Sequence, residues 1–272
     1  AFNDARRAGF DNISIDLMYG IPEQTVDSFM QSLSFAASRA PEHISLYALK
    51  IEDGTPFARR RESLPLPDED AEYEMYMRAI DYLGTRGYKR YEISNFAKPG
   101  YECRHNIGYW KRADYLGIGI GAASLIDNVR YANVRELLEY CKSCESLCGE
   151  FSGLKGENQT EIQPEKGPKE AGHEEEYRKN FTENVRKTLC VSTEPVTREE
   201  QMEEFMFLGL RMTEGVSRAE FEQYFGTTIE AVYGDVLRQL QKEGLLMKQE
   251  GRICLTERGM DVNNYVVEQF ML

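Results

Sequence analysis

The residues best suited to chemistry lie together in the segment CRHNIGYW, at positions 103–110. This segment contains His105, one of only three histidines, with Asn106, Tyr109 and the sole tryptophan, Trp110. An imidazole flanked by aromatic rings could ligate a metal ion or hold a flat macrocycle. The segment could equally be a loop that is anchored by buried aromatic rings, with His105 merely hydrogen-bonded. The residue types alone leave both interpretations open.

A second candidate is Asp16, which lies in the β-rich run at residues 12–18. Because side chains alternate along a strand, Ser14, Asp16 and Met18 are expected on one face and the apolar residues on the other. A carboxylate on the inner face of a barrel strand, followed by the turn Gly-Ile-Pro at 20–22, lies where (β/α) barrels hold ligands. The alternative is a buried aspartate that accepts hydrogen bonds from backbone amides.

Three of the six cysteines, Cys141, Cys144 and Cys148, follow the spacing C-x2-C-x3-C. On a helix their thiols would share one face, where three thiolates could bind zinc or an iron–sulfur cluster. They could equally be small residues on the face of a helix. No second cysteine pair has zinc-finger spacing, and this favours the second interpretation.

The first half of the chain alternates predicted strands with predicted helices. Strands are predicted at residues 12–18, 43–49 and 88–94, and helices at 26–38 and from about 68 to 87. This order is typical of parallel α/β architecture. Since three strands cannot close a barrel of about eight, the sequence predicts part of a (β/α) barrel. We expect its three strands to be parallel neighbours with one unpaired edge.

Three polar residues lie at the ends of these predicted strands. Glu92 and Ser94 end the third strand and could face the same mouth as Asp16. His43 opens the second strand and is interpreted as incidental to any site.

The second half of the chain changes character at about residue 149. Residues 149–176 contain eight acidic and three basic residues with several glycines and prolines, and too few apolar groups to offset the entropy of ordering. A disordered insertion or linker is therefore predicted over 149–198. Residues 199–272 predict three helices followed by a β-hairpin, a winged-helix layout. The barrel part is then expected to occupy residues 1–148.

The charge balance argues against partners that require a basic surface. The net charge of −13 disfavours nucleic acids and anionic membranes. Residues 201–272 carry seven Lys and Arg against twelve Asp and Glu, a net charge of −5, so the winged-helix region is interpreted as a structural or docking domain. No apolar run approaches the roughly 20 residues that span a bilayer. Six cysteines without a signal peptide favour a reduced, cytoplasmic compartment.

Several segments together resemble the HemW family of haem chaperones, radical-SAM proteins similar to the oxygen-independent coproporphyrinogen III oxidases. The matching segments are IDLMYGIPEQT (15–25), HISLYALKIEDGTPF (43–57), GYKRYEISNFAKPGYECRHNIGYW (87–110), YLGIGIGAAS (115–124) and EEFMFLGLRMTEGV (203–216). The motif H-N-x-x-Y-W separates the chaperone branch of the family from the true oxidases. The resemblance covers nearly everything except roughly residues 145–198.

The resemblance implies that Asp16 helps to bind S-adenosylmethionine, and that His105, Asn106, Tyr109 and Trp110 belong to a haem-binding segment. It implies a protein that binds haem as cargo and delivers it to haem-accepting proteins; the alternative is part of a coproporphyrinogen III oxidase. It also implies a [4Fe-4S] cluster held by a C-x3-C-x2-C motif, which this chain lacks. The chain begins at Ala1 in a predicted helix. We therefore expect a C-terminal portion of a larger protein that performs no radical chemistry alone.

Overall fold

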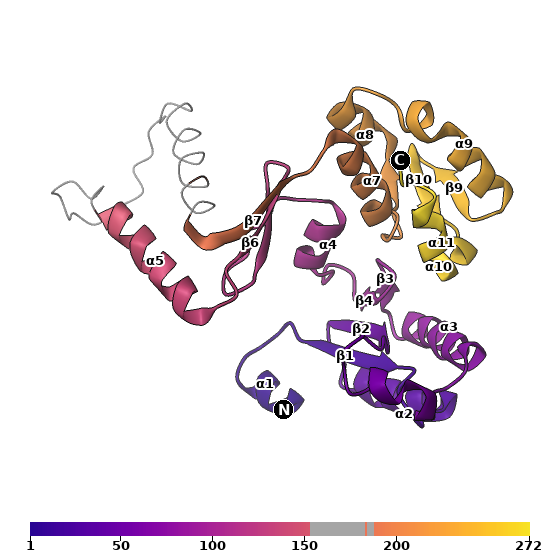
Figure 1. Cartoon of the computed structure of the whole chain (residues 1–272). Coiled ribbons are helices and arrows are strands. Elements are labelled where there is room, and N and C mark those ends of the chain that lie inside the picture. Colours follow the sequence, from indigo (N-terminus) through magenta and orange to yellow (C-terminus); the bar gives the residue numbers. More distant parts are fainter. Residues whose placement is uncertain (153–182, 184–187) are drawn as a thin grey trace. The chain divides into compact units, whose positions relative to one another are not determined.

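The computed structural model describes residues 1–152, 183 and 188–272 (Figure 1). The chain forms two compact units. One consists of Ala1–Arg112 together with Met202–Leu272, and the other of Ala113–Gln201. The first unit is therefore built from two stretches of sequence, and the second unit is inserted between them.

The N-terminal part of the chain, in which apolar and polar residues alternate, forms a sheet with strand order β1-β2-β4-β3. Strand β1 (Ser14–Tyr19) lies at its edge and pairs in parallel with β2 (His43–Ala48). These two strands are connected by helix α2 (Val26–Ser38), as predicted. The short helix α1 (Phe2–Arg7) precedes β1, and the short helix η1 (Ala58–Ser63) follows β2.

Helices α2 and α3 (Glu69–Thr85) cover the apolar face of this sheet. Each helix begins at a residue whose side chain caps it: Thr25 accepts a hydrogen bond from the Ser28 amide, and Asp68 does so from the Ala71 amide. The core between helices and sheet consists of Phe29, Leu33, Ala37, Ile44, Leu46, Met75, Ala79, Leu83, Tyr88 and Phe96. The opposite face of β1 and β2 is free to carry polar residues.

The prediction of a third parallel strand at residues 88–94 is wrong. Two short strands, β3 (Lys89–Arg90) and β4 (Asn95–Ala97), form here instead, and β4 runs antiparallel to both β2 and β3. The chain reverses direction between them because the buried Glu92 carboxylate accepts hydrogen bonds from the Ser94 amide at 2.8 Å and from the Asn95 side chain at 2.5 Å. The barrel part is α/β, but only its first two strands, β1 and β2, pair in parallel.

The second unit contains a three-stranded antiparallel sheet and a helix that lies between its second and third strands in the sequence. Strands β5 (Ala123–Ile126) and β6 (Val129–Asn133) are joined through Asp127 and Asn128, which both adopt positive φ, as a two-residue hairpin turn requires. Helix α5 (Leu137–Ser152) follows them, and β7 (Cys190–Pro195) completes the sheet by pairing with β6. The predicted linker over 149–198 is therefore wrong for residues 190–195, whose pairing with β6 could not be seen from composition. Residues 153–182 and 184–187 of that prediction lie outside the described part of the chain.

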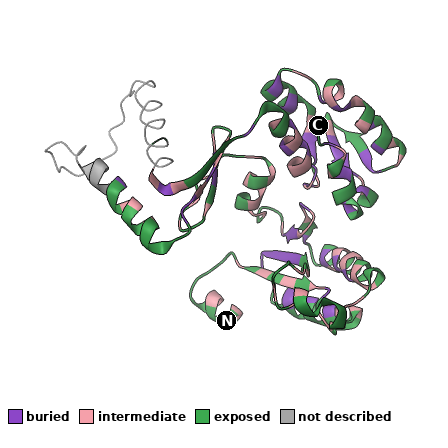
Figure 2. Cartoon of the chain, in the orientation of Figure 1, coloured by how far each residue is buried: buried purple, intermediate pink, exposed green. Residues whose placement is uncertain are grey.

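The C-terminal stretch has the predicted winged-helix-like layout. Three helices, α7 (Arg198–Gly209), α8 (Arg218–Phe225) and α9 (Ile229–Lys242), precede the hairpin of β9 (Leu246–Gln249) and β10 (Arg252–Leu255). A two-residue strand, β8 (Val216–Ser217), adds to β10, and the helices α10 (Glu257–Asp261) and α11 (Asn263–Glu268) end the chain. Figure 2 shows buried residues on the helices and strands of this stretch. Phe221, Leu237, Ile253 and Phe270 are among the residues of its hydrophobic core.

Candidate functional site

Asp16 lies on the polar face of the sheet, as the alternation along β1 predicts. Its neighbours on β1, Ile15 and Leu17, are half-buried, whereas Asp16 is exposed and lies opposite Ser45 of β2. Leu17 packs with the apolar core under the helices. Asp16 therefore faces away from the helix layer.

A cavity of about 810 Å³ opens beside Asp16. Its wall combines the polar face of β1 and β2 with the segment that leads into helix α4 (Arg104–Trp110). The polar side chains that line it include Ser14, Asp16, His43, Ser45, Tyr47, Glu102, Cys103, Arg104 and Asn106. Three residues of α4, namely Arg104, Asn106 and Ile107, thus line the same cavity as the predicted carboxylate. Glu92 and Ser94 do not line it, so the expectation that they share this mouth with Asp16 is wrong.

Helix α4 presents His105 and Tyr109 on one exposed side. The two residues are four positions apart, and their rings meet edge to face with centroids 4.8 Å apart at 88°. Both side chains are exposed. They are therefore accessible to a large ligand. His105 does not line the cavity beside Asp16, whereas its neighbour Asn106 does. The helix therefore offers one side to the cavity and another to solvent.

Trp110 is held by the C-terminal stretch of the same unit. The Arg211 guanidinium lies 4.4 Å from the centre of the Trp110 ring, and its Nη2 lies 3.9 Å from Oε2 of Glu92. Burial raises the pKa of the Glu92 carboxyl, while hydrogen bonds from Asn95 and the nearby Arg211 charge oppose that rise. The ring face of Trp110 that Arg211 covers is thus occupied by a protein cation. Trp110 belongs to the anchored side of α4.

His43 lines the cavity, although its position at the start of a strand predicted no role for it. Its imidazole is 5% exposed, with Nδ1 at 2.9 Å from the Ser14 hydroxyl and Nε2 at 2.9 Å from the Tyr91 hydroxyl. Burial lowers the pKa of His43, and the negative charge of Asp16 opposes this shift. The only signal in the sequence is register: if β1 and β2 are parallel, Ser14 and His43 lie side by side.

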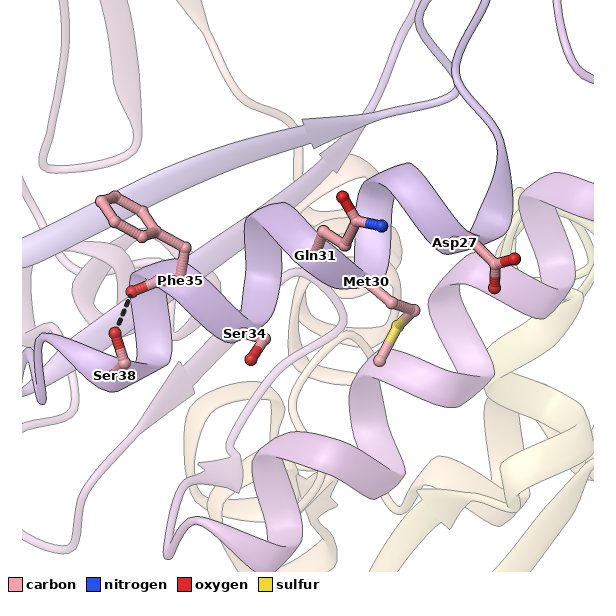
Figure 3. Close-up of a pocket in the computed structure, with 6 residues that line it drawn as sticks. All are labelled: Asp27, Met30, Gln31, Ser34, Phe35 and Ser38. Atoms are coloured by element: carbon pink, nitrogen blue, oxygen red, sulfur yellow. Dashed lines mark hydrogen bonds between the residues drawn. The ribbon is translucent and has the colours of Figure 1, made fainter.

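A second hollow, of about 560 Å³, is formed along α2 and carries no comparable chemistry. Figure 3 shows its six labelled residues on the one helix, where the Ser38 hydroxyl donates a hydrogen bond to the Phe35 carbonyl at 2.7 Å. The lining residues are Asp27, Met30, Gln31, Ser34, Phe35 and Ser38. Side chains from a single helix do not converge on a ligand, so this groove is not a candidate site.

No metal site is formed by the described residues, among which no three His, Cys, Asp or Glu side chains cluster closely enough to hold an ion. Cys141 is exposed, and Cys144 packs against Leu147 and Leu189, as expected of a small residue on the face of a helix. The Cys148 side chain lies outside the described part. In that part, no helix is both long and apolar enough to cross a membrane.

Replacing Arg211 with alanine is expected to move the fluorescence emission of Trp110 to longer wavelength, because the ring loses its cover and gains contact with water. The stack contributes about 0.5–2 kcal/mol in a partly desolvated setting, and Trp110 is the sole tryptophan, so the emission reports on it alone. Arg211→Lys should restore the emission only in part, since lysine cannot stack its charge as a plane. Arg238→Ala, at an exposed arginine of α9, should leave the emission unchanged.

Parts of the chain are similar to known proteins. Residues 196–262 match the HemN C-terminal domain family. Proteins named heme chaperone HemW are 34% identical in Lactococcus lactis, over 98% of this chain and 60% of the relative, and 35% identical in Bacillus subtilis, over 100% and 62%. The chain thus spans about three fifths of these relatives.

The solved structure of the Escherichia coli coproporphyrinogen III oxidase HemN, described as a radical SAM enzyme, matches 99% of this chain and 57% of its own. The TM-score is 0.69 at 20% sequence identity, which establishes a common fold. The full-length sequence similarity at 34–35% identity is to the HemW proteins instead. Over nearly all of its length the chain is therefore similar in sequence to the HemW proteins, and it shares its fold with HemN.

Proposed function

We propose that the chain is part of a haem chaperone that binds haem at the exposed side of α4 and delivers it to haem-accepting proteins. The names of the relatives support this function. The observation that carries it is the edge-to-face pair of His105 and Tyr109, which is exposed on a seven-residue helix. The alternative, a coproporphyrinogen oxidase, is supported by the match to the HemN C-terminal domain and by the fold of HemN at 20% identity, whereas the higher identity over nearly the whole chain is to the HemW proteins.

The chemistry of this pair suits a transient haem site. A neutral imidazole nitrogen of His105 can ligate haem iron, and Tyr109 adds an aromatic surface for the macrocycle. An exposed pair leaves the second face of the macrocycle open, so that an acceptor protein can reach the cargo. A sealed pocket would hold haem more tightly but would obstruct its release. The cytoplasmic location expected from the cysteines is part of this proposal.

S-adenosylmethionine is the cofactor that the resemblance suggests for the cavity beside Asp16. An ionised carboxylate accepts hydrogen bonds from hydroxyl and ammonium groups, both of which this cofactor carries. Ser45, opposite Asp16, and Arg104 add a hydroxyl and a positive charge to the cavity wall. The residues described thus fit the cofactor. They supply no set of three ligands for an iron–sulfur cluster, and no step of the proposed function involves one.

Haem titration tests the role of His105. The wild-type chain should shift the Soret band of added haem, and His105→Ala should weaken this binding about tenfold or more, since the loss of an axial ligand exceeds that of an ordinary hydrogen bond of about 1 kcal/mol. Cys103→Ala is the matched control, because Cys103 is the nearest competing ligand and is only half-buried. It should preserve the spectrum. If neither substitution alters the spectrum, α4 does not carry the haem site.

A further inference from the structure

A continuous run of hydrogen bonds connects Asp16 with the first turn of α4. The Ser14 hydroxyl donates to Oδ1 of Asp16 at 3.4 Å and lies 2.9 Å from Nδ1 of His43. Nε2 of His43 is 2.9 Å from the Tyr91 hydroxyl, which accepts a hydrogen bond from the Cys103 amide at 3.3 Å. The run therefore passes from β1 through β2 and the turn before β4 to the residue that caps α4.

The chemistry of its members gives this run a single direction. An ionised Asp16 can only accept, so the Ser14 proton points toward Asp16 and its oxygen must accept from His43. Nδ1 of His43 then carries the proton, and Nε2 is left to accept from the Tyr91 hydroxyl. That hydroxyl donates its only proton to His43, which is why its oxygen is free to accept from the Cys103 amide. Every donor in the run points from α4 toward Asp16.

The interior of the run is shielded from water. His43 is 5% exposed and Tyr91 is 8% exposed. Burial lowers the pKa of His43, which favours the neutral imidazole that the run needs, and burial raises the pKa of Tyr91, which keeps its hydroxyl protonated. The Asn106 side chain also hydrogen-bonds Tyr91, so two positions of the α4 region depend on this one hydroxyl.

We propose that His43 and Tyr91 are positioning residues, which fix the first turn of α4, and with it His105, in an orientation set by the charge of Asp16. The Asp16 cavity and the exposed side of α4 are then coupled through His43 and Tyr91. A ligand that engages the Asp16 carboxylate alters the orientation of the helix that carries His105. The identity of the ligands rests on the proposed function, whereas the hydrogen-bond run itself does not.

Nitrogen NMR of the histidine side chains and amide hydrogen exchange test this proposal on the whole chain without any ligand. His43 should be the neutral Nδ1–H tautomer in the wild type. Tyr91→Phe removes one acceptor without changing the shape of the ring, and should speed exchange at the Cys103 amide about 2–10-fold, the equivalent of one hydrogen bond. Asp16→Asn should shift the tautomer balance of His43, because an amide can donate to Ser14 where the carboxylate only accepts.

Two matched controls separate the run from its surroundings. Asp11→Asn removes the same charge five residues earlier, at an exposed position whose carboxylate is not part of the run. Tyr47→Phe removes a hydroxyl from the same cavity. Both should leave the His43 tautomer and the Cys103 exchange unchanged.

Three results would overturn the proposal. These are an Nε2–H tautomer of His43 in the wild type, unchanged Cys103 exchange in Tyr91→Phe, or an Asp16→Asn variant in which His43 is unaltered. Haem titration is read separately. If the NMR and exchange results are as expected but His105→Ala binds haem normally, the positioning role stands and the proposed haem site fails.

Discussion

Replacing Arg112 with alanine is expected to lower the free energy of unfolding by about 3–5 kcal/mol, because it leaves a buried carboxylate without its guanidinium. Nε of Arg112 donates a hydrogen bond to Oε2 of Glu204 at 2.5 Å, and the two side chains are only 13% and 7% exposed. The pair connects the end of α4 with α7 inside the first unit. Urea unfolding followed by Trp110 fluorescence measures the loss, since this tryptophan lies two residues away.

The neighbouring Lys111 provides the control. It also forms an ion pair, with Glu214 at 3.0 Å, but its side chain is 54% exposed and that of Glu214 is 43% exposed. Solvent-exposed pairs contribute about 0–1 kcal/mol, so Lys111→Ala should change stability little. Equal losses of stability in the two variants would show that burial does not make the Arg112–Glu204 pair more stabilising than an exposed pair.

Gly215→Ala is expected to cost about 1–2 kcal/mol for its backbone conformation and about 1–3 kcal/mol more for overpacking. Gly215 adopts φ of +62°, and a Cβ there would lie 2.1 Å from the carbonyl oxygen of Ile253 and 2.7 Å from Cα of Cys254. Both atoms belong to the backbone of β10 and cannot turn aside. The variant should therefore open the small sheet of β8, β10 and β9.

Gly226→Ala carries the backbone contribution without the overpacking. Gly226 ends α8 with φ of +60°, nearly the same as Gly215, but a Cβ at this position would meet no atom within 4 Å. The difference between the two variants in urea unfolding, measured by circular dichroism, is the cost of the collision with β10 alone. If Gly226→Ala destabilised the protein as much as Gly215→Ala, close packing would not be the reason for glycine at position 215.

Elements whose periodicity is local were predictable from the sequence. The alternation at residues 12–18 predicted both the strand β1 and the outward face of Asp16, and helical spacing predicted α2 and the three helices of the C-terminal stretch. The contact between the rings of His105 and Tyr109 was also predictable, because residues four apart meet on one side of a helix.

Features that depend on a distant partner were not predictable. The run at 88–94 has strand composition, but Glu92 turns the chain back through hydrogen bonds with Ser94 and Asn95. Strand β8 is only two residues long and exists through its pairing with β10. The two partners of the His43 imidazole, Ser14 and Tyr91, are 29 and 48 positions away in the sequence. Such contacts are visible only once the register is known.

The insertion of one unit within the other has a consequence for synthesis on the ribosome. Arg112 and Trp110 leave the ribosome before their partners Glu204 and Arg211, which follow about 90 to 100 residues later. At about 5–20 residues per second, this delay amounts to roughly 5–20 s. During that time α4 exists without the contacts that hold its C-terminal end. A nascent chain therefore acquires a fully anchored His105 helix only after α7 and the residues up to Arg211 have been synthesised.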